Sequence, residues 1–472
     1  MIRTDSDVVR VDGAEPGGGL DGFFRISERG SSVRTEIGAG VTTWLTMAYI
    51  LFLNPVILRL VTDRAGVTLD AGQVLSVTAL VAGLATLAMG VFANYPFALA
   101  AGLGLNGFVA FTLVGTLGLS WPEAMGVIVL EGVIITVLVL TNVREMIMNA
   151  IPLDLKRAIG IGIGMFIALI GLVTGGIVVL GTDAAPVTLN PDLSNLKILV
   201  FVVGLVLAAV LVTRRVKGGL MIAILASTVL AVVINQGFGH SAIWTNGAAH
   251  VPDTWVSSPH LDLLGHFSFG FFSILGAATT IAVVLAVMLS DFFDTMGTVT
   301  ALGAEAGLLD EESKLPGVKR VLLVDSLAAV AGGATSSSSN TTYIESASGI
   351  AEGGRTGLTS VVAGGLFLVC LLFSSIAGVI PAEATAPILV VVGFFMMQGV
   401  GEIDWRDPAI GIPAFLTIAL MPFTYSITNG VGAGILSYAV IRLFQGRARD
   451  VHAWTYVVAA AFAWYFSRGL LA

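Results

Sequence analysis

Five acidic residues stand inside apolar stretches of this sequence, where a carboxylate has chemistry that it lacks in water. Asp291 and Asp294 lie one helical turn apart, so both carboxylates are expected near one face of a helix. Glu131, Asp325 and Glu345 are the other three. A charge in apolar surroundings is unstable unless it has a partner, water or a proton. Such a group can exchange a proton, or accept a hydrogen bond from the ring N–H of a neutral heterocycle.

Basic partners for these carboxylates are missing from their own segments. No Lys or Arg occurs in the interior of the apolar stretch 277–303 or in 338–352. Proton exchange is therefore a function open to Asp291, Asp294 and Glu345. For Glu131 and Asp325 a hydrogen-bonded structural carboxyl is an equally good explanation.

The composition identifies the medium around these groups. Of the 472 residues, 56% are hydrophobic and only 11% are charged, whereas a soluble domain carries roughly 25% charged residues. The hydrophobic share is enough for roughly 13 membrane spans of ~20 residues. A soluble multidomain protein and a disordered chain are both excluded. The single cysteine, Cys370, excludes a disulfide framework. The sequence predicts an all-α polytopic protein of the cell membrane.

The apolar residues fall into segments of membrane-spanning length. The first 22 residues contain no such run and are expected to be a disordered tail. A C-terminal stretch, 452–466, is short and rich in aromatics, which leaves an interfacial helix or an extra crossing open. The 14 expected segments are 37–58, 71–93, 97–117, 122–142, 155–176, 196–213, 218–236, 277–303, 320–333, 338–352, 357–377, 384–401, 408–424 and 428–445.

Lys and Arg predict the orientation, because they collect on the cytoplasmic side. Arg25, Arg29 and Arg34 precede the first segment and place the N-terminus in the cytoplasm. Alternation of 14 spans then puts most of the remaining basic residues into cytoplasmic loops. The long outside loop, 237–269, lacks Lys and Arg.

Histidines in that outside loop suggest a metal site at first sight. Their spacing matches no tight ligand pair, however, and the tryptophans among them suit a membrane interface. We therefore expect a loop without metal. The four histidines are His240, His250, His260 and His266.

Two segments interrupt the ordinary Leu/Val/Ile/Ala pattern. The stretch 94–110 contains Pro96 and three glycines, and 332–352 is rich in serine and threonine. Each is expected to be a short extended piece followed by a half-helix, which membranes tolerate only where protein or water satisfies the backbone. They are the third and tenth segments, seven apart, which predicts two inverted seven-span repeats with a substrate site between them. Tight packing and interhelical hydrogen bonds explain either segment alone, but not both at corresponding places.

Several motifs resemble the second family of nucleobase–cation symporters, and most closely its adenine/guanine/hypoxanthine permease branch. They are TEIGAGVTTWLTMAYI at 35–50 with Asn54-Pro55, DFFDTMGT at 291–298, TTYIES at 341–346 and GGRTG at 353–357. The resemblance extends from about Gly22 to about Gly446.

The resemblance implies a core domain of spans 1–4 and 8–11 and a gate domain of spans 5–7 and 12–14. Spans 3 and 10 are the broken ones. On this sequence the expected parts are the tail 1–22, the core halves 23–142 and 270–380, the gate halves 143–236 and 381–446, the extracytoplasmic loop 237–269 and a C-terminal apolar segment 447–472.

The resemblance also implies a substrate, a purine base taken up together with a proton. Asp294 and Glu345 correspond to the family's span-eight and span-ten acids, which would hold the base and carry the proton. Asn106 corresponds to the span-three asparagine, whose amide could donate to the base. The remaining residues of the expected substrate site are Gly104, Thr298, Tyr343 and Ile344.

Two other functions compete with this interpretation. An anion carrier of the same architecture would use positive helix ends, but unneutralised carboxylates beside the site disfavour it. An intramembrane aspartyl protease needs two carboxylates that share a proton, and its signatures are missing. We expect a lipid bilayer and a purine base as partners, and neither a cofactor nor nucleic acid. The preferred purine, sodium as an alternative ion and a homodimer stay open.

Overall fold

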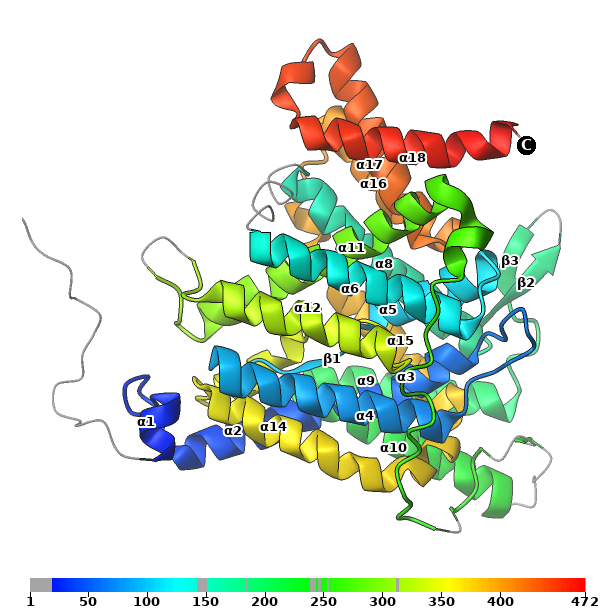
Figure 1. The fold of residues 1–472 in the computed structure, drawn as a ribbon. Helices are drawn as coiled ribbons and strands as arrows, with labels where there is room; N and C mark the ends of the chain where they lie inside the picture. Colours follow the sequence, from blue (N-terminus) through cyan, green and yellow to red (C-terminus); the bar gives the residue numbers. More distant parts are fainter. Residues whose placement is uncertain are drawn as a thin grey trace, which may run out of the picture.

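The computed structural model describes a mostly helical protein (Figure 1). It describes residues 19–141, 151–182, 185–237, 243–244, 248–252, 254–310 and 314–471. Most of the expected N-terminal tail and His240 lie outside these residues.

Within the described residues, ten helical stretches are long and apolar enough to cross a membrane. Some join two consecutive elements. The stretches are Val33–Arg59 (α2 Val33–Met47 and α3 Ile50–Arg59), Ala71–Ala93 (α4 Ala71–Ala88 and η1 Met89–Ala93), Trp121–Thr141 (α6), Leu153–Thr174 (α8), Leu196–Thr213 (α9), Gly219–Gly237 (α10 Gly219–Val232 and η3 Val233–Gly237), Phe271–Glu305 (α11), Gly357–Gly378 (α14 Gly357–Val369 and η5 Cys370–Gly378), Ala382–Glu402 (α15 Ala382–Met397 and η6 Gln398–Glu402) and Ile427–Phe444 (α17).

Four expected segments are not long apolar helices. The segments 320–333 and 408–424 form helices of 17 residues each, and 97–117 and 338–352 each begin with a three-residue strand. Besides these stretches and the strands β2 and β3, the described elements are α1 Leu20–Phe24, β1 Leu99–Ala101, α5 Leu103–Gly107, η2 Phe108–Thr116, α12 Val318–Ala334, β4 Asn340–Thr342, η4 Ile344–Ser346, α13 Ala347–Ala351, α16 Pro408–Thr424, η7 Ala448–Asp450 and α18 Ala453–Leu471.

Side-chain caps begin several of the long helices. Ser32 accepts a hydrogen bond from the Thr35 amide at the start of α2, and Asp70 accepts one from Gln73 at the start of α4. Ser426 does the same for α17. These bonds satisfy N–H groups that a helix leaves unpaired at its first turn. Residues next to the first turn therefore determine where these helices begin.

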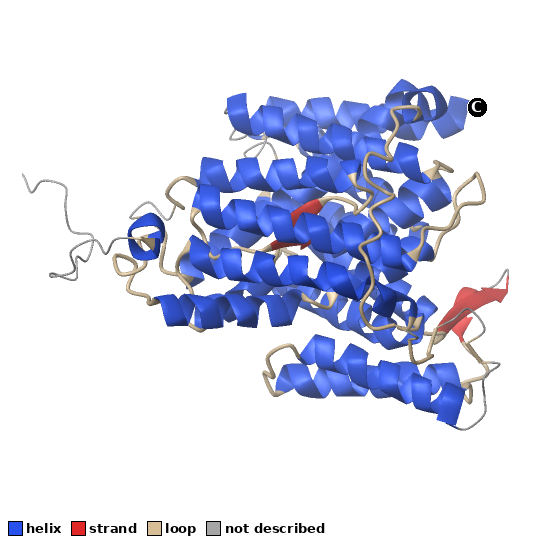
Figure 2. Ribbon diagram, turned by 60° about the horizontal axis from the view of Figure 1, so that its bottom comes forward, coloured by secondary structure: helices blue, strands red, loops and turns tan. Residues whose placement is uncertain are grey.

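The strands β1 and β4 pair in the middle of the molecule, between the helices (Figure 2). They are antiparallel, with Ala100 opposite Thr341, and all their residues are buried. Backbone bonds extend the pairing on both sides, from the Gly102 amide to the Ser339 carbonyl and from the Tyr343 amide to the Ala98 carbonyl, each 2.9 Å long. Two extended segments far from water thus satisfy each other's backbone groups.

Glycine lets the helices α4 and α14 pack backbone to backbone. A Cβ atom on Gly364 would lie 2.7 Å from the carbonyl oxygen of Gly83, a distance that real Cβ atoms do not show. Small residues at helix crossings are typical of membrane proteins, because close backbone approach replaces the hydrophobic effect there.

The helix α11 is longer than the segment 277–303 predicts. It begins at Phe271 and contains one break, at Gly276, whose φ of 67° and ψ of 170° suit glycine. The break redirects the chain near the start of the helix. The part of the helix after the break carries Asp291 and Asp294.

Two regions outside the long helices have more structure than the sequence predicts. The strands β2 (Val178–Thr182) and β3 (Ala185–Leu189) form a hairpin where only a loop is expected (Figure 2). The C-terminal helix α18 is longer than the stretch 452–466 and packs against α17 and α11.

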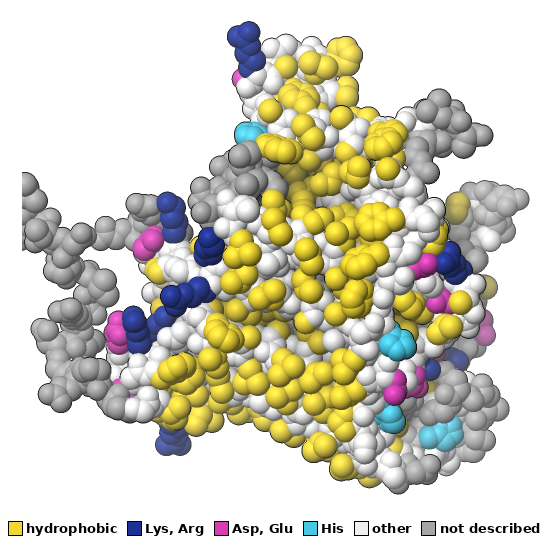
Figure 3. Space-filling model, in the orientation of Figure 1, with side chains coloured by type: hydrophobic (Ala, Val, Ile, Leu, Met, Phe, Trp, Pro, Cys, Tyr) yellow, Lys and Arg dark blue, Asp and Glu magenta, His cyan; other side chains and the backbone are white. Residues whose placement is uncertain are grey.

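The surface of the molecule has a broad apolar band. Figure 3 shows hydrophobic side chains over the middle of one face, with most Lys and Arg at one end of the helices and most His at the other. Exposed Phe423 and Phe444 are typical of side chains that face lipid. The chain is thus a polytopic membrane protein.

Candidate functional site

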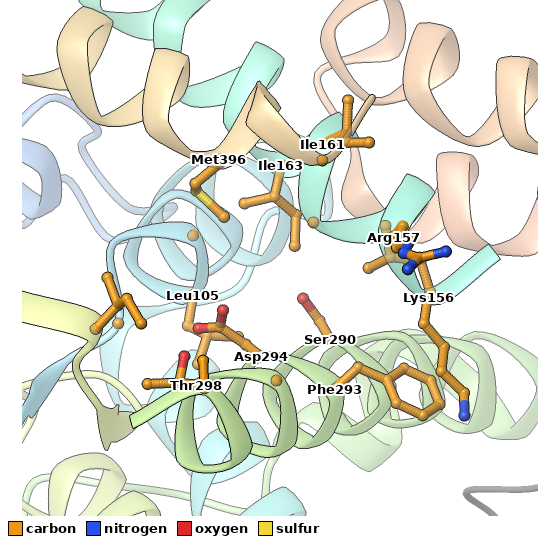
Figure 4. Close-up of a pocket in the computed structure, with 18 residues that line it drawn as sticks. Leu105, Lys156, Arg157, Ile161, Ile163, Ser290, Phe293, Asp294, Thr298 and Met396 are labelled. Carbon is orange, nitrogen blue, oxygen red and sulfur yellow. The ribbon is translucent and has the colours of Figure 1, made fainter. Parts of the chain in front are cut away.

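A cavity of about 470 Å³ lies between α11, α5 and the N-terminal part of α8, as far as Ile163 (Figure 4). Its lining is mostly apolar. The lining residues are Gly102, Gly104, Leu105, Lys156, Arg157, Ile159, Gly160, Ile161, Ile163, Ser290, Phe293, Asp294, Gly297, Thr298, Ala301, Ile344, Met396 and Gly399.

Asp294 is the acidic residue among the described lining residues of this cavity. Its side chain is exposed, and its carboxylate points toward Leu105 (Figure 4). Ser290 and Thr298 are one turn before and after it, on the same face of α11. The helix thus presents one carboxylate and two hydroxyls to an otherwise apolar space, an arrangement that suits a flat ring with polar edges.

Asp291 does not join Asp294 at the cavity, contrary to the expectation that both carboxylates share one face. Its side chain is buried, and its carboxyl group lies near that of Glu131 on α6. Successive helical residues are 100° apart, so Asp291 and Thr295 form a stripe beside the one that carries Asp294. The two aspartates therefore have separate surroundings.

Asp325 of α12 ties three elements together. It accepts hydrogen bonds from the Thr295 hydroxyl at 2.8 Å, the Thr342 amide at 2.8 Å and the Thr342 hydroxyl at 2.7 Å. The residue is buried away from the cavity, and it links α11 and α12 to β4. These contacts fit the structural carboxyl that the sequence leaves open for this position.

Glu131 is buried as well. Ser339, just before β4, donates to one of its oxygens at 3.5 Å, and the other oxygen has no partner apart from its contact with Asp291. Among the described residues, no group of three or more His, Cys, Asp and Glu side chains is placed to hold a metal ion.

Glu345 lies next to the cavity without lining it. Its neighbour Ile344 lines the cavity, whereas the Glu345 carboxylate accepts a hydrogen bond from the hydroxyl of Tyr49, in the turn between α2 and α3. Tyr343 is also turned away, and its hydroxyl donates to the Ala101 carbonyl. Of the two acids expected to hold substrate, Asp294 thus lines the cavity and Glu345 does not.

Of the two expected site residues in the third segment, one lines the cavity and the other does not. Gly104 lines the cavity, and a Cβ atom there would lie 2.5 Å from Cγ2 of Ile163 on α8. Asn106 is buried, is not part of the lining, and neither its amide nitrogen nor its oxygen has a partner in the described structure.

A family comparison decides where this chain belongs. A family model described as "Permease family" (Xan_ur_permease) matches residues 34–432. The chain belongs to this family. The resemblance inferred from the motifs at 35–50, 291–298 and 341–346 is confirmed.

Full-length relatives of the permease carry purine names. Adenine permease AdeQ of Escherichia coli strain K12 is 38% identical over 448 residues, which cover 94% of this chain and 96% of the relative. Guanine/hypoxanthine permease PbuG of Bacillus subtilis strain 168 is 37% identical over 454 residues, 94% of this chain and 98% of the relative. The permease is a transporter and not an enzyme, so the protease alternative is not favoured.

The fold of the permease is similar to that of a solved transporter. The transmembrane domain of the cyanobacterium bicarbonate transporter BicA superposes with a TM-score of 0.61 at 14% identity, covering 85% of this chain and 97% of that one. At this identity the similarity concerns the fold alone.

Residues of the helices α8 and α15 complete the cavity of the permease, and the sequence did not predict them. The Lys156 ammonium lies 5.0 Å from the centre of the Phe293 ring, and Arg157 pairs with Glu402 at 2.7 Å. Both basic residues stand at the rim and not beside the Asp294 carboxylate (Figure 4). Their sequence signal was positive charge, which predicts a cytoplasmic helix end and carries no information about a site.

Proposed function

We propose that this permease takes up purine nucleobases, adenine, guanine or hypoxanthine, together with a proton. The names of the full-length relatives AdeQ and PbuG support the purine. The cavity supports it too, because about 470 Å³ falls within the usual range of small-molecule sites.

One observation carries the proposal: the Asp294 carboxylate stands in an apolar cavity away from the basic residues at its rim. A purine has apolar faces and ring N–H groups at its edge. The faces would lie against Leu105, Ile163 and Phe293, and an N–H would donate to Asp294. A charge-assisted hydrogen bond of this kind is stronger than one between neutral groups.

Alternating access would move this cavity between the two sides of the membrane. In our proposal the chain forms 14 spans in two inverted repeats, with a core domain moving against a gate domain. The antiparallel pairing of β1 and β4 supports the repeat, since it joins the third and tenth segments. Asp294 and Glu345 would take up the proton and release it toward the cytoplasm.

Competition for uptake tests the function. Tritiated hypoxanthine is offered to cells that lack purine permeases of their own and express this chain, with adenine, guanine, xanthine, uracil or sulfate as unlabelled competitors. We expect adenine or guanine to compete and uracil and sulfate to have no effect. A protonophore should abolish accumulation, whereas replacement of sodium should not. Uptake that sulfate suppresses and purines do not would contradict the proposal.

A further inference from the structure

Tyr49 is a fully buried residue whose hydroxyl makes a hydrogen bond to one of the expected substrate-binding acids. It stands in the turn between α2 and α3, and its side chain is 0% exposed. Its hydroxyl donates to the Glu345 carboxylate. A buried tyrosine hydroxyl needs such a partner, because leaving it unpaired costs free energy.

Glu345 is held on the side of Tyr49 and not on the side of the cavity. The carboxylate is partly buried, and Glu345 is missing from the residues that line the cavity, although its neighbour Ile344 lines it. Glu345 is the second residue of a short helical turn, Ile344–Ser346, which follows the strand β4 after Tyr343. A change of side-chain rotamer there would turn the carboxylate from α3 toward the space beside Asp294.

The distance between Tyr49 and Glu345 is fixed by the frame around them. Asn54 of α3 donates to the Ser337 carbonyl at 3.0 Å and to the Thr78 hydroxyl of α4 at 2.7 Å. The helix that follows Tyr49 is therefore tied to the segment that precedes β4. We therefore expect the Tyr49 bond to break by a turn of the Glu345 carboxylate, with both backbones held in place.

We propose that Tyr49 is a positioning residue that holds Glu345 away from the cavity and competes with the purine for the Glu345 carboxylate. This inference rests on the proposed function. When a base binds, one of its N–H groups takes the place of the Tyr49 hydroxyl on the Glu345 carboxylate. The free-energy cost of breaking the Tyr49–Glu345 hydrogen bond lowers the affinity for the base. The same bond keeps the Glu345 carboxylate turned from the cavity until a base is present.

The variant Tyr49→Phe removes the hydroxyl and keeps the ring. If the hydroxyl competes with the base, its loss lowers the dissociation constant for hypoxanthine about 3- to 10-fold. The maximal uptake rate should fall, because a base held more tightly leaves more slowly. Binding of tritiated hypoxanthine to the purified permease and uptake into proteoliposomes measure the two effects separately.

Three further variants keep the test specific. Tyr95→Phe also removes a buried hydroxyl, one that donates to the Pro316 carbonyl, and should leave hypoxanthine binding unchanged. In a Glu345→Ala background, Tyr49→Phe should change the dissociation constant less than about 2-fold, because the shared acid is gone. Tyr49→Met, which also lacks the hydroxyl, replaces the Phe variant if that one does not fold.

The outcomes separate this inference from the function on which it rests. If the wild-type permease binds no purine, the proposed function fails and the inference fails with it. If the wild type binds hypoxanthine and a folded Tyr49 variant binds it equally or more weakly, the inference alone is overturned. An undiminished effect of Tyr49→Phe in the Glu345→Ala background would overturn it as well.

Discussion

At the scale of single residues, Asp291 and Asp294 differ in what their side chains contact. Asp294 faces the cavity, while Asp291 is buried against Glu131. The spacing of one helical turn predicts that both lie on roughly one side of α11, and this holds for the backbone positions. It does not predict which neighbouring helix covers each position, because that depends on the packing of α6 and α12.

The direction of the Glu345 side chain is another feature that the sequence could not supply. The motif TTYIES places the acid at the start of a helical turn, which the structure has. Its rotamer depends on Tyr49, a residue about 300 positions earlier, and no local pattern links the two. Resemblance to a family predicts which acids bind the substrate, but it does not predict the contacts that their side chains make.

Gly104 gives a prediction at this scale. The variant Gly104→Ala places a methyl group 2.5 Å from Ile163 Cγ2 and narrows the cavity. Overpacking costs about 1–3 kcal/mol, so KM for purine uptake should rise about 5- to 150-fold. The matched control is Gly160→Ala, which also lines the cavity but whose Cβ meets no atom within 4 Å. Equal KM values for the two variants would contradict the assignment of this cavity to the substrate.

At the scale of elements, glycine and serine patterns carry most of the predictive information. The stretches 94–110 and 332–352 lack the residues of an ordinary span, and each forms a short strand followed by helical turns. Their pairing into one sheet joins residues about 240 positions apart, which local sequence does not reveal. No strand is predicted at 178–189, although valine and threonine there favour one.

The crossing of α4 and α14 gives a prediction for these elements. Gly364→Leu would push a side chain into the Gly83 backbone and should destabilise the permease by at least about 2 kcal/mol. Gly365→Leu is the control, because its Cβ meets no atom within 4 Å, and it should change stability by less than about 0.5 kcal/mol. Thermal unfolding of both variants in detergent measures the difference. Equal melting temperatures would show that the two helices do not cross in this way.

At the scale of the whole molecule, the two ends of the helices differ in the charge of their side chains. Lys and Arg gather at one end of the apolar band (Figure 3). The 14-segment pattern and the Lys and Arg positions predict that this end is cytoplasmic. The end that carries Ser258 would then face outside.

Cysteine labelling tests this orientation. The chain has one cysteine, Cys370, so a Cys370→Ala background removes it. In that background a membrane-impermeant maleimide should label Ser258→Cys in intact cells and Arg25→Cys only after permeabilisation, since both positions are exposed. Labelling of Arg25→Cys in intact cells, with Ser258→Cys protected, would reverse the orientation.

The central claim is that this permease carries purines through the cavity at Asp294. The most direct measurement is accumulation of tritiated hypoxanthine by proteoliposomes that contain the purified wild type or Asp294→Asn, with an imposed inward proton gradient. The wild type should accumulate hypoxanthine saturably. Loss of one charge-assisted hydrogen bond, about 1.5–3 kcal/mol, should raise KM in Asp294→Asn about 10- to 150-fold. A folded Asp294→Asn protein with wild-type KM and accumulation, or a wild type that accumulates no purine, would contradict the claim.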